Sequence, residues 1–106
     1  MADRFEKLAK SLGIGPVTKP ADPIKPQRMN ANAFCIRNRV FAMRVGDDLV
    51  LKLPPNRVTD LVQAKVASSN IVGGHVMKEW ANLPPSAEKK WLALTKESLD
   101  YVRNKR

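Results

Sequence analysis

The sequence predicts an α+β protein: an antiparallel meander sheet of four to five strands, packed by an N-terminal helix, a middle helix and a long C-terminal helix. Two observations support this prediction. Apolar and polar residues alternate between Ala33 and Leu53, with turn residues between the runs, as in half-buried strands. The segments on either side repeat their apolar residues every three to four positions, as helices do. With 106 residues the chain has room for one domain, which we expect to span 1-106.

The first predicted helix runs from Asp3 to Leu12, and Gly13 and Pro16 end it. Its apolar face consists of Phe5, Leu8, Ala9 and Leu12. Residues 16–29 follow as a proline-rich connector. Its four prolines lack a backbone donor, which excludes a central strand and leaves room for one short edge strand near Val17 and Thr18. Pro20, Pro23 and Pro26 also match the spacing of a ligand for an aromatic groove, although a stiff connector laid over the domain is the better explanation.

Three strands of a meander come next, with reversals around Asn38 and at 46–48. Strict alternation assigns each side chain to one of the two faces of the sheet. We expect eight side chains to face the helices: Phe34, Ile36, Phe41, Met43, Val45, Leu49, Leu51 and Leu53. The other face should carry Arg37, Arg44 and Lys52 together with Cys35, Val40, Ala42 and Val50.

The second half of the chain begins with Pro54-Pro55, which ends the third strand. Asn56 is then expected to cap a helix that continues to about Ala67. Residues 68–74 are predicted to be a polar, glycine-containing loop, and 75–83 a fourth strand. Pro84-Pro85-Ser86 predicts the start of a last helix from Ala87 to about Asn104. The buried side of that helix should hold Trp91, Leu94, Thr95, Ser98 and Val102.

Four short motifs, taken in order, resemble the TfoX N-terminal domain family, which is related to the MmcQ/YjbR-like group. They are the segments 40–43 (VFAM), 49–54 (LVLKLP), 57–62 (RVxxLV) and 76–80 (VMKEW). The similarity covers roughly Met29 to Val102. It implies an antiparallel sheet packed by helices, a role in competence regulation, a loosely assigned DNA-binding property and no enzymatic activity. Where family members carry an aromatic residue and a glycine after the methionine, this chain has Asn30 and Ala31.

We searched the sequence for the residue patterns of the main catalytic classes and found none complete. Asp47 and Asp48 are adjacent in a tight turn, where they are expected to form the turn and not a pair of catalytic acids. Cys35 is the single cysteine and His75 the single histidine, so a metal site would also need carboxylates, and no segment shows the short-range ligand spacing of a zinc or calcium site. Gly73 and Gly74 precede a strand and not a helix, so they do not form a phosphate loop. We therefore predict no catalytic, metal or cofactor-binding residues.

Five residues make up the candidate binding surface: Arg37, Arg44, Lys52, Lys78 and Trp80. The first three should share one open sheet face, half basic and half apolar, on which a partner could dock. Trp80 has Lys78 beside it, so it could stack on a base or a peptide. It could equally fill the junction between sheet and helices while Lys78 reaches past it to solvent.

These observations lead to three hypotheses of function. The first is a non-enzymatic module that acts through protein contacts, with a protein partner or a second copy. The alternative is direct, salt-sensitive binding of DNA or RNA, since 19 Lys and Arg against 10 Asp and Glu give a net charge of +9. The third is a small enzyme that uses Cys35. We expect a cytoplasmic protein without a membrane partner or a small-molecule substrate, because one cysteine and no apolar run near ~18 residues indicate a reducing, aqueous compartment.

Overall fold

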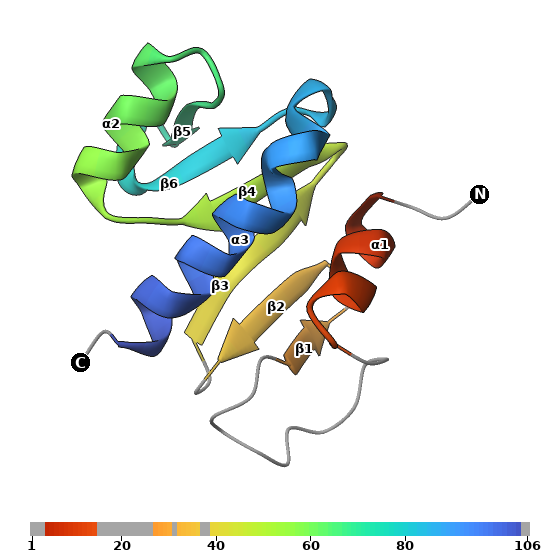
Figure 1. The fold of residues 1–106 in the computed structure, drawn as a ribbon. Helices are drawn as coiled ribbons and strands as arrows, with labels where there is room; N and C mark the ends of the chain where they lie inside the picture. The colour runs from red at the N-terminus through yellow and green to blue at the C-terminus, as the bar shows by residue number, and fades with distance from the viewer. Residues whose placement is uncertain (1–3, 15–26, 31, 37–38, 105–106) are drawn as a thin grey trace.

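The computed structural model describes residues 4–14, 27–30, 32–36 and 39–104, and of 27–30 only the backbone. Three α-helices and six strands make up this part of the chain (Figure 1). In chain order they are α1 (Arg4–Ser11), β1 (Gln27–Asn30), β2 (Ala33–Ile36), β3 (Arg39–Val45), β4 (Asp48–Lys52), α2 (Pro55–Gln63), β5 (Ser68–Val72), β6 (His75–Leu83) and α3 (Glu88–Arg103). A short 3-10 helix, Pro85–Ala87, leads into α3.

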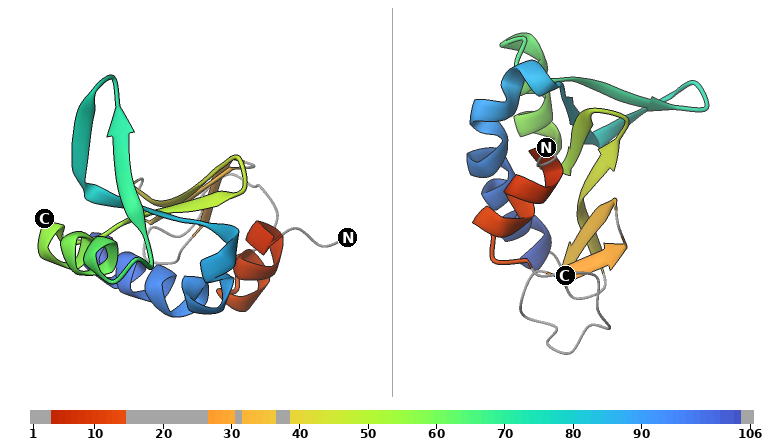
Figure 2. Two further views of the ribbon diagram at one scale, coloured as in Figure 1. Left: turned by 90° about the horizontal axis from the view of Figure 1, so that it is seen from above. Right: turned by 90° about the vertical axis from the view of Figure 1, so that its right-hand side faces the viewer.

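All six strands form one antiparallel sheet in the order β1-β2-β3-β4-β6-β5. The three helices lie together on one face of this sheet, and the opposite face carries none of them (Figure 2). The predicted α+β class, with its N-terminal, middle and long C-terminal helices, is confirmed. The sheet departs from a simple meander at one place. Because α2 crosses over between β4 and β5, the chain returns through β6 to pair with β4.

The core fills the space between the helices and the inner face of the sheet. Phe5 of α1 stacks on Phe34 of β2 with ring centroids 4.2 Å apart, and this contact holds the first helix on the sheet. On α3 the five side chains predicted to be buried are buried: Trp91, Leu94, Thr95, Ser98 and Val102. The Trp91 indole donates a hydrogen bond to the Pro84 carbonyl at 3.2 Å, so the start of the last helix is fixed to the loop before it.

A β-bulge in β3 overturns part of the predicted face assignment. Phe34 pairs with Ala42 but Cys35 pairs with Val40, so Phe41 is one extra residue in the strand. An extra residue moves every later side chain of that strand to the other face. Ala42 therefore packs in the core, whereas Val45, predicted to point inward, is 57% exposed. Met43, also predicted to face the helices, pairs with Val50 on the outer face.

The bulge is connected to α3 by one buried hydrogen bond. The register assigns Phe41 no partner on either neighbouring strand. Its carbonyl instead accepts a hydrogen bond from the Ser98 hydroxyl at 2.6 Å, and Ser98 is fully buried. A side chain from the helix thus supplies a partner for a backbone group at the place where the ladder is interrupted.

Three further predictions about individual elements need correction. The segment 68–74 is not a loop, since Ser68–Val72 forms β5. The cap of α2 is Pro54 and not Asn56, and the helix ends at Gln63. Residues 27–29, expected to belong to the connector, lie in β1. Residues 16–26, which include the edge strand considered near Val17 and Thr18, and the turn at Asn38 lie outside the described residues.

Candidate interaction surface

The end of the β5–β6 hairpin, residues 70–77, stands out from the body of the protein, and we call it the arm. Both views in Figure 2 show it projecting from the sheet on the side away from the helices. Its strands pair only with each other, Asn70 with Met77 and Ile71 with Val76. The register then jumps, because Ser69 pairs with Ala81. Residues 78–80 of β6 thus have no partner on β5, and the arm is a two-stranded ribbon outside the sheet.

A glycine pair closes the arm. Gly73 and Gly74 have φ angles of +57° and +81°, which are the two positive values that a type I′ turn requires. This two-residue turn has the twist that matches a β-hairpin, so it fixes Val72 opposite His75. In the sequence, the Gly-Gly dipeptide between β-branched residues indicates this hairpin. The polar residues Ser68-Ser69-Asn70 before it led instead to the prediction of a loop.

The arm exposes apolar side chains. Among the described residues, four of the five exposed large apolar side chains belong to it: Ile71 at 61%, Val72 at 58%, Val76 at 56% and Met77 at 38%. The fifth is Val45, on β3. A hairpin of two strands is marginally stable in water when no further layer covers it. Clustered exposed apolar side chains on such an element are unusual on a surface that faces only water, so the arm is the candidate interaction surface.

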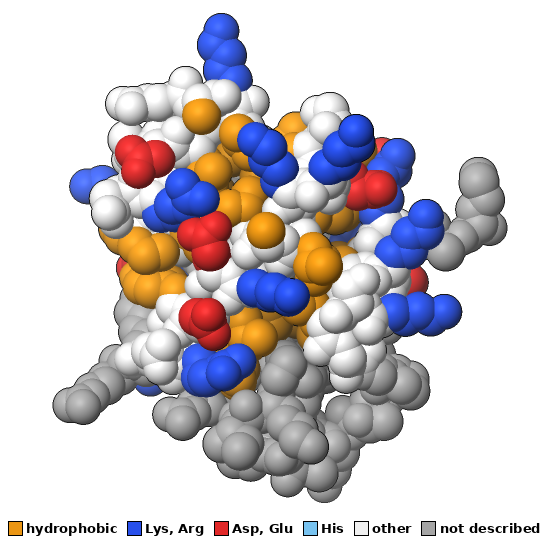
Figure 3. Space-filling model, in the orientation of Figure 1, with side chains coloured by type: hydrophobic (Ala, Val, Ile, Leu, Met, Phe, Trp, Pro, Cys, Tyr) orange, Lys and Arg blue, Asp and Glu red, His pale blue; other side chains and the backbone are white. Residues whose placement is uncertain are grey.

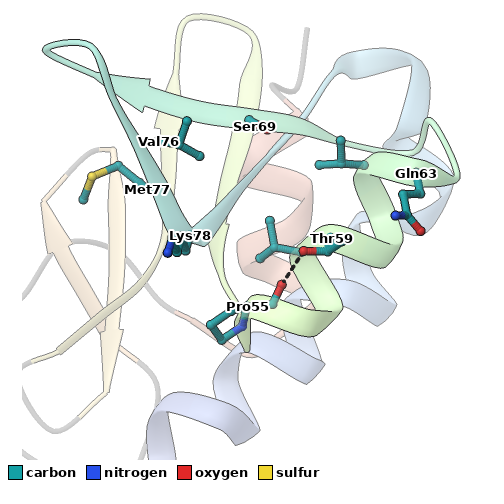
Figure 4. A pocket seen from close by; sticks show the side chains of 9 residues that line it. Pro55, Thr59, Gln63, Ser69, Val76, Met77 and Lys78 are labelled. Atoms are coloured by element: carbon teal, nitrogen blue, oxygen red, sulfur yellow. Dashed lines mark hydrogen bonds between the residues drawn. The ribbon is translucent and has the colours of Figure 1, made fainter.

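A groove lies between the arm and α2, with a volume of about 430 Å³ (Figure 4). Most of its lining is apolar or uncharged, and among the described residues Lys78 is the only charged one that lines it. The lining residues are Pro55, Val58, Thr59, Val62, Gln63, Ser69, Val76, Met77 and Lys78. The Thr59 hydroxyl donates to the Pro55 carbonyl at 3.0 Å, so this hydroxyl is satisfied within the helix and adds little polarity to the groove.

The predicted basic sheet face does not form as expected. Arg44 pairs with Leu49, whose side chain is in the core, so Arg44 lies on the helical side of the sheet. Lys52 alternates with the core residue Leu51 and lies on the open side. The prediction that Arg44 and Lys52 share a face is wrong, because the bulge at Phe41 shifts the phase of β3. Arg37 lies outside the described residues.

The remaining predicted site residues are on β6. Trp80 pairs with Lys52 across the strands, and the Lys52 ammonium lies 5.6 Å from the centroid of its ring. This cation–π contact covers the half-buried indole from the open side. Lys78 is exposed beside the groove. Between them, Glu79 accepts a hydrogen bond from the Tyr101 hydroxyl at 2.7 Å, which ties β6 to α3.

The groups considered for catalysis are far apart. Cys35 is on β2 and His75 is on the arm, with β3 and β4 between their strands. Burial raises the pKa of the Cys35 thiol, which makes the thiolate scarcer at neutral pH. Among the described residues, no three His, Cys, Asp or Glu side chains come close enough to hold a metal ion. Cys35 and His75 therefore do not meet in this structure.

The helical face has a different character from the arm. Lys and Arg side chains are spread over it with Asp and Glu among them (Figure 3). Several are paired, for example Arg57, which donates two hydrogen bonds to the Glu97 carboxylate at 3.0 and 3.1 Å. The hydrogen bond to Glu97 is the main cause of the raised pKa of Arg57. This face is a mixed, hydrated surface.

No family model, no curated protein and no solved structure matches this chain. In the part of the chain that the structure describes, no helix combines the length and the apolar character needed to cross a bilayer.

Proposed function

We propose that this protein is a non-enzymatic binding module that acts through protein contacts, and that the arm with its groove is the contact surface. The observation that carries the proposal is the concentration of exposed apolar side chains on Ile71, Val72, Val76 and Met77. The resemblance of the central motifs to the TfoX N-terminal domain family supports the same interpretation, since that family implies a regulatory role without catalysis.

The test is a comparison of proteins retained from a cell lysate by the immobilised wild type and by two variants. Val76→Lys places a charge in the groove and on the arm. Val45→Lys is the matched control, because Val45 has nearly the same exposure, 57% against 56%, but lies outside the arm. We expect retention by the wild type and by Val45→Lys, and its loss with Val76→Lys. Equal retention by all three proteins would exclude the arm as the contact surface.

Direct binding of nucleic acid is the second candidate, and the net charge of +9 is the observation that favours it. The residues once expected to form its surface are split between the two sides of the sheet, because Arg44 is on one side and Lys52 on the other. Binding through one shared basic face would require both residues. A loss of affinity for DNA or RNA that is confined to Arg44→Ala and Lys52→Ala would therefore favour this candidate over the protein-binding module.

A further inference from the structure

We propose that the arm pairs with the arm of a second copy of this chain, through antiparallel association of the two β5 strands about a twofold axis. This inference rests on the proposed function and specifies the partner of the same surface. An isologous contact of this kind uses one patch twice, so the patch must be complementary to itself. The following features of β5 and the arm meet that requirement.

The outer edge of β5 lacks the charged side chains and prolines that protect many edge strands, although its pairing with β6 shifts register between Ser69 and Asn70. It is a terminal strand of the six-stranded sheet, so one side of its backbone has no ladder partner among the described strands. Natural edges are protected by charged side chains, prolines or very short strands. Ser68–Val72 is five residues long and contains no charge and no proline. The free N–H and C=O groups of such a strand form a template for another strand.

The charge distribution indicates which partner fits. Residues 66–77 form the longest run of the sequence without Lys, Arg, Asp or Glu, and Lys65 and Lys78 flank it. An acidic partner would be attracted to the basic surfaces, and the arm offers it no cation. Two copies of a chain with a charge of +9 repel each other wherever their charged surfaces meet. The arm, which has no Lys, Arg, Asp or Glu, is the place where they can approach with the least repulsion, and a second arm is equally apolar.

The pairing within the arm is compatible with a register centred on Ile71. Ile71 pairs with Val76, so both side chains are on one face of the arm. In a twofold antiparallel pair whose axis is normal to the sheet, directly opposed residues must face the same side. A register centred on Ile71 satisfies this condition and places Ile71 opposite its own copy. The result is a row of four β-branched side chains across four strands, Val76 and Ile71 of one copy followed by Ile71 and Val76 of the other.

The first experiment measures mass against concentration by sedimentation equilibrium, from about 10 µM to about 1 mM, because one pair of strands is a small interface and predicts a weak dimer. The weight-average mass of the wild type should rise from 11.8 kDa toward twice that value. Ile71→Lys should remain monomeric, since the twofold axis would bring two ammonium groups face to face. Val45→Lys, the control with similar exposure outside the arm, should dimerise like the wild type.

The second experiment tests the register by oxidative crosslinking in a Cys35→Ala background, which removes the native thiol. Ile71→Cys should form a disulfide-linked dimer, because the two Cα atoms would be within the ~4.4–6.8 Å that a disulfide spans. Val72→Cys should crosslink much less, because each Val72 would lie opposite Asn70 of the other copy and two residues away from its equivalent. Crosslinking of Val72→Cys that equals that of Ile71→Cys would overturn the proposed register.

Circular dichroism of each variant shows whether a loss of dimer reflects a loss of fold. A mass of 11.8 kDa at every concentration would overturn the second copy as partner. If Val76→Lys still abolished retention from the lysate in that case, the proposed function would stand and its partner would be a different protein. A dimer that persists in Ile71→Lys would overturn pairing through the arm.

Discussion

Ser98 and Phe41 show how one residue determines the geometry of the sheet. The extra residue at Phe41 leaves a carbonyl group buried between the sheet and α3, and the Ser98 hydroxyl is the donor that pairs with it at 2.6 Å. A buried carbonyl without a partner costs free energy that the rest of the fold must offset. The stability of the bulge thus depends on a serine 57 residues further along the chain. The bulge in turn determines which side chains of the second half of β3 face the helices.

Ser98→Ala should lower the free energy of unfolding by about 1–3 kcal/mol, because it leaves the Phe41 carbonyl buried without its donor. The matched control is Thr95→Val on the same helix. The Thr95 hydroxyl donates to the Trp91 carbonyl, which can also accept the backbone hydrogen bond of its own helix, so this change should cost less than ~1 kcal/mol. Urea unfolding measures both. If both variants lost the same free energy of unfolding, the hydrogen bond between Ser98 and Phe41 would contribute no more than the one within the helix.

Cys35 should make stability depend on pH in the alkaline range. Its folded-state pKa is raised from 9.0 because burial disfavours the thiolate. At neutral pH the thiol is protonated in both states and contributes no pH dependence. Above about pH 9 the unfolded chain ionises first, so stability falls as the pH rises toward the folded-state pKa. Between pH 8 and pH 10 the urea midpoint of the wild type should fall more than that of Cys35→Ala. Equal decreases of the urea midpoint in the wild type and in Cys35→Ala would contradict a contribution of Cys35.

Among the elements, the helices, the central strands and β6 could be predicted from the sequence, and β5 could not. Amphipathic repeats located α1 and α3 because each buries one stripe against the sheet. Alternation failed at two places where the chain departs from a regular ladder. One is the bulge at Phe41, because no glycine, proline or other turn residue indicates it in the sequence. The other is β5, whose residues are mostly exposed and therefore lack the apolar alternation that burial imposes.

The candidate site was only partly predicted for the same reasons. Trp80 and Lys78 were identified because a mixed aromatic and basic motif is visible in the sequence. Their arrangement was not, since Trp80 is covered by Lys52 from the neighbouring strand. The contact between Lys52 and Trp80 depends on the order of β4 and β6, which periodicity within one segment does not determine.

The turn of the arm provides a test at the level of one element. Gly74→Val should loosen the arm, because a β-branched residue at a φ of +81° costs at least about 1–2 kcal/mol. A Cβ at this position would meet nothing within 4 Å, so the backbone conformation alone is responsible. Amide exchange at Ile71 and His75 should become faster, while the urea midpoint of the core changes little. Gly73→Asn is the control and should preserve the turn, since Asn tolerates a positive φ. Unchanged exchange in Gly74→Val would contradict the type I′ assignment.

For the whole molecule, the distribution of charge over the surface determines binding to polyanions more than the net charge does. The surplus of +9 is spread over the surface, and on the helical face it is interspersed with acidic residues (Figure 3). A diffuse positive charge attracts polyanions weakly and from any direction, whereas a specific site places several cations on one surface. The arm contains no Lys, Arg, Asp or Glu, whereas the helical face carries charges of both signs.

Binding to a DNA duplex of about 20 base pairs should accordingly be weak, independent of sequence and steeply dependent on salt. Fluorescence anisotropy should show the affinity falling about tenfold or more between about 50 mM and about 200 mM salt. Arg44→Ala and Lys52→Ala should each reduce affinity no more than Lys96→Ala on α3, because the three residues share no common face. Affinity that survives the higher salt, or depends selectively on Arg44 and Lys52, would favour the nucleic-acid alternative.

The order of the strands also has a consequence for synthesis. β4 is complete at Lys52, but its neighbour on that side, β6, is not made until residue 83. During that interval the nascent chain presents the bare flank of β4 and the leucines that α3 will later cover. A pause of the ribosome after α2 would prolong this exposure, so rare codons between 64 and 83 would be disfavoured in an efficiently produced gene.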